Sequence, residues 1–181
     1  MSIAEFQRAF ADLVAHPEQV LGVRAGDDAI LADYDLDARE RERLGALARD
    51  EGMSVNCSLY RVNRLVPVYS VLPHSCRLLG DRLIGELEGF WAASRHATLQ
   101  FRWEAWRFGL WLQERIAGGH LPGGPVEDMV RLEMAMFDTQ SASDPRERRR
   151  LVRLRYDPHA LLDPATPPAS LRPAPGEIGV L

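Results

Sequence analysis

Histidine, serine and cysteine are among the residue types in this sequence that could bind a metal ion or act as a nucleophile. The histidines share no spacing typical of a metal-binding helix or strand; they stand at His16, His74, His96, His120 and His159. His74 is followed by Ser75, but no carboxylate that would orient this pair can be identified. Nucleophile-elbow, phosphate-loop and dinucleotide-binding motifs do not occur in the sequence.

Cys57 and Cys76 are the two cysteines, and they lie in apolar surroundings without metal-ligand spacing. We expect both to be small buried hydrophobic residues. The sequence therefore predicts no catalytic residue, no metal ligand and no cofactor in this chain. An enzyme that assembles scattered histidines and cysteines is the alternative, and such an enzyme would bind metal when purified alone.

The segment LYRVNR places four polar side chains beside an apolar stripe: Tyr60, Arg61, Asn63 and Arg64. In a helix, we expect Leu59, Val62 and Val66 to turn toward the core. The polar residues could then bind carboxylates of a partner protein or peptide. They could equally form salt bridges within the chain.

A dense basic run follows further along, comprising Arg146, Arg148, Arg149, Arg150, Arg153 and Arg155. Within it, Leu151, Arg153 and Arg155 alternate with Val152, Leu154 and Tyr156, which is the periodicity of a strand. The run could track the phosphates of a nucleic acid. It could instead pair with an acidic peptide that lies along the exposed edge of the strand.

The composition of the chain argues against several classes of protein. The chain has 181 residues, 46% of them hydrophobic, and a net charge of −4, which argues against a nucleic-acid-binding domain. The amphipathic N-terminus does not resemble a signal peptide, and no apolar run approaches the length of a membrane span. We therefore expect a cytoplasmic protein.

Helical periodicity and capping signals predict the elements that position these residues. Asp37 and Glu40 resemble a capping box for a helix with Leu44 and Leu47 on its inner face. Pro67 should kink or interrupt the central helix. The expected helices cover residues 3–16, 18–24, 28–33, 37–52, 53–72, 81–91, 101–116 and 126–137, the last with Met129, Leu132 and Met136 inward.

After a polar break at residues 138–145, the sequence predicts a strand at 148–156, a proline-rich loop and a short final strand at 176–181. The fold class expected is α+β: mainly an α-helical bundle with a small C-terminal antiparallel β-sheet. We expect a helical domain over 1–143, divided into a small-helix cluster (1–50) and a helical core (51–143), and a small β region over 144–181.

The helix expected at 101–116 is aromatic on more than one side, with Trp103, Trp106 and Leu110 on one stripe and Phe108 and Trp111 elsewhere. Core packing explains most of this pattern. A second apolar face could also be buried by a partner protein.

The order of these motifs resembles the partner subunits of multinuclear non-haem iron oxidative enzymes, which include helper proteins of methanobactin-type and thiaglutamate-type peptide biosynthesis. The resemblance covers roughly residues 50–160 and rests on LYR-x-NR, LLGDRL, EAWRFGLWL and VEDMVRLEMAMF. A related group named as DNA-binding domains shares the aromatic helix followed by RLE.

The resemblance implies a non-catalytic subunit that forms a heterodimer with a TIM-barrel iron oxidase. The oxidase would hold the iron and modify a ribosomally made precursor peptide. This chain would help to recognise that peptide through its C-terminal sheet, with LVRLRY as the docking strand and Arg153 and Arg155 available to acidic residues. The sheet is abbreviated here, since only 177–181 could add a strand. The competing function is a DNA-binding or regulatory protein that uses Arg146–Arg155.

Overall fold

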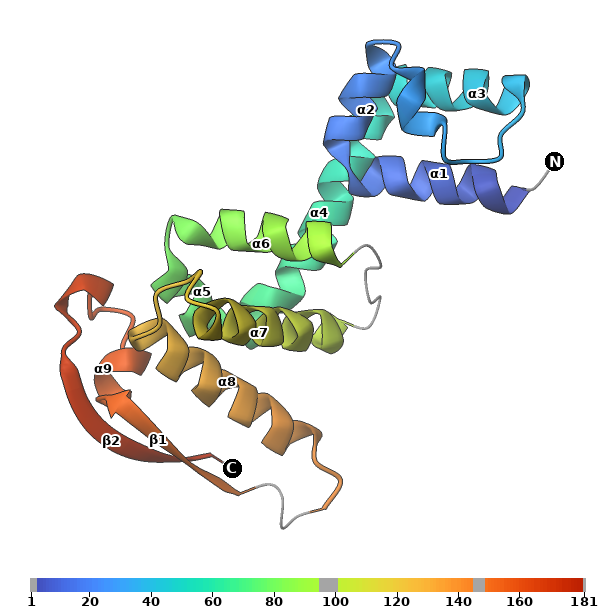
Figure 1. The fold of residues 1–181 in the computed structure, drawn as a ribbon. Coiled ribbons are helices and arrows are strands. Elements are labelled where there is room, and N and C mark those ends of the chain that lie inside the picture. The colour runs from blue at the N-terminus through green and yellow to red at the C-terminus, as the bar shows by residue number, and fades with distance from the viewer. Residues whose placement is uncertain (1–2, 95–100, 145–148, 181) are drawn as a thin grey trace. The chain divides into compact units, whose positions relative to one another are not determined.

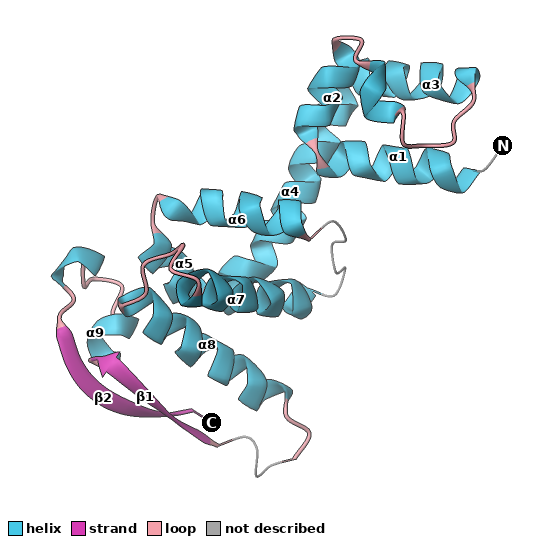
Figure 2. Ribbon diagram, viewed as in Figure 1, coloured by secondary structure: helices cyan, strands magenta, loops and turns pink. Residues whose placement is uncertain are grey.

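The computed structural model describes residues 3–94, 101–144 and 149–180 (Figure 1). The helices are α1 (Ile3–Ala15), α2 (Pro17–Arg24), α3 (Ala38–Arg49), α4 (Glu51–Val71), α5 (Pro73–Leu79), α6 (Arg82–Ala93), α7 (Phe101–Ala117), α8 (Pro125–Ser141) and α9 (Pro158–Leu162). Two short 3₁₀ helices are η1 (Asp28–Leu31) and η2 (Pro168–Ser170), and the strands are β1 (Arg150–Tyr156) and β2 (Pro173–Val180). The expected fold class, mainly helical with a small C-terminal antiparallel sheet, is confirmed (Figure 2).

The chain divides into two compact units, residues 1–63 and 64–181, and the boundary lies within α4. Each unit has a hydrophobic core of its own. The sequence predicts divisions near residues 50 and 143. The β region shares a core with the helices of the C-terminal unit, because Val152, Leu154 and Val180 pack in the same cluster as Phe108 and Met129.

In the N-terminal unit, local hydrogen bonds cap α3 and hold it against η1. Asp37 accepts a bond from the Glu40 amide at 2.8 Å, and the Glu40 side chain accepts one from the Asp37 amide at 2.9 Å, so the expected capping box is present. Arg41 donates to the carbonyl oxygens of Leu31 and Tyr34 and so ties η1 and its following turn to α3. The core residues of this unit are Ala9, Leu13, Val20, Val23, Leu31, Leu36, Leu44, Ala48, Met53 and Cys57.

Helix α4 continues through Pro67 to Val71. Proline removes one backbone donor from a helix interior, but the helix does not end at this position, so Pro67 does not interrupt it. The next proline, Pro73, instead occupies the first position of α5, where its missing N–H would have had no partner in any case.

Helices α6, α7 and α8 build most of the core of the C-terminal unit. Glu86 on α6 accepts hydrogen bonds from Trp111 Nε1 at 3.1 Å and from Arg115 Nε at 3.1 Å, both on α7. A Cβ added at Gly109 would lie 2.3 Å from Met134 Sδ, so the glycine permits the close approach of α7 and α8. Phe90 and Phe108 pack with ring centroids 5.5 Å apart.

The two strands pair antiparallel, with Val152 opposite Ile178 and Arg153 opposite Glu177, and the register shifts between Leu154 and Tyr156. Beside α8 they form a curved ribbon (Figure 1). The segment between them, expected as a loop, contains α9 and η2. Arg77 of α5 donates to the carbonyl oxygens of Leu161 and Thr166, which holds this segment against the helices.

Two expectations about helix faces are wrong. Leu47 of α3 is exposed, and Ala48 takes the inner position beside Leu44. Met136 of α8 is also exposed, whereas Met129 and Leu132 are buried as expected. No helix in the described part of the chain combines the length and hydropathy that crossing a bilayer requires.

Candidate functional site

One face of α4 carries exposed apolar residues, which we call the α4 stripe: Val55, Leu59, Val62, Val66 and Tyr69. Steps of four and three residues keep all five on the same side of the helix. These residues are between 43% and 57% exposed. The expectation that Leu59, Val62 and Val66 turn toward the core is therefore wrong, because they face solvent.

A different set of α4 residues is buried. Met53 and Cys57 lie in the core of the N-terminal unit, and Val68 lies in the core of the C-terminal unit. The helix thus has two apolar faces, and among the described residues one of them is buried while the other is about half-exposed. An apolar face of this kind is typical of a protein–protein contact.

The polar face is the name we give to the four polar residues of LYRVNR. One of them, Arg64, lies in the interior of the C-terminal unit. It is 5% exposed, and its Nε donates to Glu104 Oε1 at 2.6 Å. Its guanidinium carbon lies 5.7 Å from the ring centroid of Phe90 and 5.4 Å from that of Trp91. Of the two roles left open for the polar face, Arg64 takes the internal salt bridge.

The other three residues of the polar face belong to the N-terminal unit. Tyr60 and Arg61 are half-buried, and Asn63 is exposed. Asn63 follows Leu59 by four residues and therefore borders the α4 stripe. The structure thus does not bring the four residues together as one binding surface.

The two sides of β1 differ as the sequence predicts. Val152 and Leu154 are buried, whereas Leu151, Arg153 and Arg155 are exposed and Tyr156 is half-buried. Arg153 Nε donates to Glu177 Oε1 at 2.7 Å across the sheet.

The other described arginines of β1 also pair with carboxylates. Arg155 donates to Glu127, and Arg150 pairs with Asp138 at 2.9 Å. Contact with Glu127 raises the pKa of Arg155 above its usual value. Arg149 is exposed, and Arg146 and Arg148 lie outside the described residues.

Asp128, which the sequence reasoning missed, fastens the end of β1 to α8. Its carboxylate is fully buried and accepts hydrogen bonds from the backbone amides of Arg155 and Tyr156, the latter at 3.1 Å. Arg131 supplies a guanidinium to the same carboxylate. The sequence signal was an acidic residue among apolar residues on the inner face of VEDMVRLEMAMF.

The sheet leaves one strand edge suited to pairing. Among residues 3–94, 101–144 and 149–180 no third strand pairs with β1. The outer edge of β2 is poorer in donors, because Pro173 and Pro175 have no N–H. Since Asp128 occupies the amides of Arg155 and Tyr156, the part of β1 that remains for another strand is Arg150–Leu154.

Glu133 is a second buried carboxylate that the sequence did not single out as functional. It accepts hydrogen bonds from the amides of His74 and Ser75 at 2.8 and 3.0 Å, and from Ser75 Oγ at 2.5 Å. It thereby satisfies the first turn of α5. Burial raises the pKa of Glu133 from 4.5 to about 7, against the opposing effect of these donors and of Arg77.

The described histidines and cysteines do not form a metal-binding cluster. Within the described residues no group of three or more His, Cys, Asp or Glu side chains could hold a metal ion, and His96 lies outside those residues. Cys57 and Cys76 are both buried, as expected, and lie in different units. Burial raises the pKa of both thiols, that of Cys76 to about 12, which keeps them protonated.

The candidate site therefore consists of two surfaces: the α4 stripe and the edge of β1 with which no described strand pairs. Neither brings acid, base and nucleophile together. In comparisons with known proteins, no protein-family model, no curated protein and no solved structure matches this chain.

Proposed function

We propose that this chain is a non-catalytic partner subunit that binds a TIM-barrel iron oxidase and helps it to recognise a ribosomally made precursor peptide. The observation that carries the proposal is the α4 stripe, an apolar face that nothing in the described chain covers. The motif resemblance in residues 50–160 supports the class of partner.

The geometry of the stripe suits a helical partner. From Val55 to Tyr69 it extends over about 21 Å at 1.5 Å per residue. Its alternating steps of four and three match the seam along which two helices pack. A TIM barrel presents an outer ring of helices, so its surface offers such faces. Covering each half-exposed aliphatic residue would contribute about 1 kcal/mol.

The precursor peptide would dock on the edge of β1, between Arg150 and Leu154. A peptide that adds a strand gains main-chain hydrogen bonds, and the exposed Leu151 offers an apolar contact. Arg153 and Arg155 already pair with Glu177 and Glu127. Main-chain bonding therefore supplies most of the affinity in this proposal, and charge supplies less than the basic run alone suggests.

Iron belongs to the oxidase in this proposal, and this chain contributes binding. The DNA-binding alternative receives less support. Each of Arg150, Arg153 and Arg155 lies against a carboxylate, which would repel the phosphates of a duplex.

Replacing apolar residues of the α4 stripe with charged residues tests whether the stripe binds the oxidase. We would co-express the chain with a TIM-barrel iron oxidase from the same genome and compare the wild type with a Leu59→Glu/Val62→Glu variant by affinity co-purification. Both residues are exposed, and glutamate is a good helix former, so the variant should fold. Ile84→Glu is the matched control, since Ile84 is an exposed aliphatic residue on α6.

The wild type and the Ile84→Glu variant should co-purify with the oxidase, and the stripe variant should lose at least about tenfold in affinity. If the stripe variant binds as the wild type does, the contact lies on another surface. If the wild type itself does not bind any such oxidase, the proposed function is wrong.

A further inference from the structure

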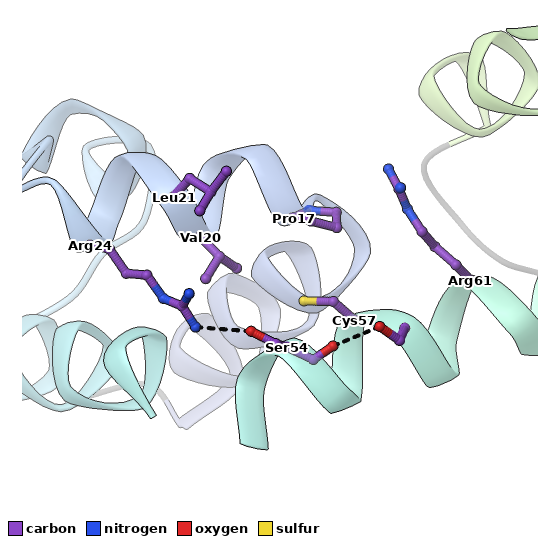
Figure 3. A pocket seen from close by; sticks show the side chains of 8 residues that line it. Pro17, Val20, Leu21, Arg24, Ser54, Cys57 and Arg61 are labelled. Carbon is purple, nitrogen blue, oxygen red and sulfur yellow. Dashed lines mark hydrogen bonds between the residues drawn. The ribbon is translucent and has the colours of Figure 1, made fainter. Parts of the chain in front are cut away.

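A pocket of about 260 Å³ lies between α2 and α4 in the N-terminal unit (Figure 3). Its apolar part is formed by Pro17, Val20 and Leu21 of α2 together with Cys57 of α4. Leu21 is 62% exposed at the pocket, although it is a large aliphatic residue. The pocket thus offers an apolar surface that a bound chain could cover.

Two arginines flank this apolar surface. Figure 3 shows Arg24 and Arg61 on opposite sides of Cys57, with Arg24 directed toward Ser54. Arg24 Nη2 donates to Ser54 Oγ at 3.2 Å and to the Asp50 carbonyl oxygen at 3.4 Å, while its Nε donates to the Ala48 carbonyl oxygen. All three acceptors are neutral. Within the described residues, no carboxylate is bonded to Arg24.

The pKa of the Cys57 thiol depends on the charged residues around the pocket. Burial raises its pKa, whereas the charges of Arg24 and Arg61 act to lower it. Glu18 is the acidic residue that acts in the opposite direction, and its effect is the smallest of these. Both arginines therefore line the pocket beside an apolar wall.

We propose that this pocket binds a carboxylate carried on a short apolar chain. The carboxylate would lie at Arg24 and Ser54, where a guanidinium nitrogen and a hydroxyl can both donate. The chain would cover Leu21 and Val20. The small volume fits one such chain better than a larger cofactor. The carboxylate could come from a free acid or from the C-terminal residue of a peptide. This site does not depend on the proposed oxidase partner.

Hexanoate is the first probe, with 1-hexanol as a neutral control of equal chain length. Titrated into the full-length chain and followed by amide chemical shifts, hexanoate should shift residues 17–24 and 54–61 in a saturable way. Hexanol should bind at least about tenfold more weakly. N-acetylleucine, which resembles the C-terminal residue of a peptide, and its amide, which lacks the carboxylate, then distinguish the two sources of the carboxylate. If N-acetylleucine binds more tightly than hexanoate, the ligand is a peptide C-terminus. If hexanoate binds more tightly than N-acetylleucine, the ligand is a free acid.

A matched pair of variants locates the site. Leu21→Glu places a carboxylate at the pocket and should weaken hexanoate binding at least about tenfold. Leu47→Glu adds the same charge to an exposed position of α3 outside the pocket and should leave binding unchanged. Equal binding of hexanol and hexanoate, or no saturable shift at residues 17–24 and 54–61, would overturn the proposal.

Discussion

Arg64 and Glu104 form an ion pair in the interior of the C-terminal unit, and both residues are almost fully buried. Removing the guanidinium leaves a buried carboxylate without this partner. We expect Arg64→Leu to lower the free energy of unfolding by about 3–5 kcal/mol. Chemical denaturation of the purified chain measures this change.

A double variant distinguishes the effect of an unpaired buried charge on the free energy of unfolding from the effect of altered packing. Replacing both partners, as in Arg64→Leu/Glu104→Leu, should recover most of the loss, since neither charge of this pair then remains buried without its partner. Arg153→Gln is the control, because the Arg153–Glu177 pair is exposed and should contribute less than about 1 kcal/mol. A single Arg64→Leu change as mild as the control would show that Arg64 is not a structural residue.

Glu133 makes stability depend on pH. Its folded-state pKa of about 7 lies above its ordinary value of 4.5, so the folded protein binds this proton more tightly than the unfolded chain does. The contribution is full below pH 4.5 and is lost as the pH rises through 7. The stabilisation lost across this window is at most about 3 kcal/mol.

Unfolding the wild type and Glu133→Gln in urea across this window isolates the effect. The stability difference, wild type minus variant, should fall as the pH rises from 4.5 through 7. His74 has a lowered pKa, so its own contribution is lost as the pH falls, but it is present in both proteins and cancels. A difference that does not vary with pH would contradict the assigned proton.

At the scale of elements, Asp128 joins β1 to α8 through two backbone amides and a guanidinium. Asp128→Asn removes the charge that these donors share and should lower the free energy of unfolding by about 2–4 kcal/mol. Amide hydrogen exchange should accelerate at Arg155 and Tyr156 in particular.

Asp138→Asn provides the comparison for this variant. Asp138 pairs with Arg150 of the same strand, but at a largely solvated position, so its loss should be below about 1 kcal/mol. If both variants exchange and unfold alike, the end of β1 is not held by the buried carboxylate.

Local patterns predicted the elements well. The Asp37–Glu40 capping box, the helix ending before Pro17 and the alternation in LVRLRY each depend on short-range chemistry that the sequence displays directly. The proline-rich segment was harder to predict. Proline at the first position starts α9, and contacts from Arg77 hold the segment in place, which no local pattern shows.

Helix faces were predicted less well, and α4 shows why. Periodicity groups residues on one face of a helix, but it does not say which face turns inward. The more apolar stripe, with Leu59 and Val62, was assigned to the core. The structure instead buries Cys57 in the core of the N-terminal unit and Arg64 in the interior of the C-terminal unit, where Glu104, distant in sequence, neutralises the arginine.

At the scale of the whole molecule, the chain consists of two compact units with separate cores, and α4 belongs to both. Buried polar residues stabilise the C-terminal unit, since Glu86, Glu104, Asp128 and Glu133 each bond to donors from another element. These buried charged residues therefore serve the fold. The exposed apolar residues of α4 remain available to a partner.

The measurement that tests this account most directly is co-expression of the chain with a TIM-barrel iron oxidase of the same genome, followed by gel filtration and iron analysis. We expect a 1:1 heterodimer in which the oxidase holds the iron, and we expect this chain to carry no iron when it is purified alone. Separate elution of the two proteins, or iron bound to this chain by itself, would contradict it.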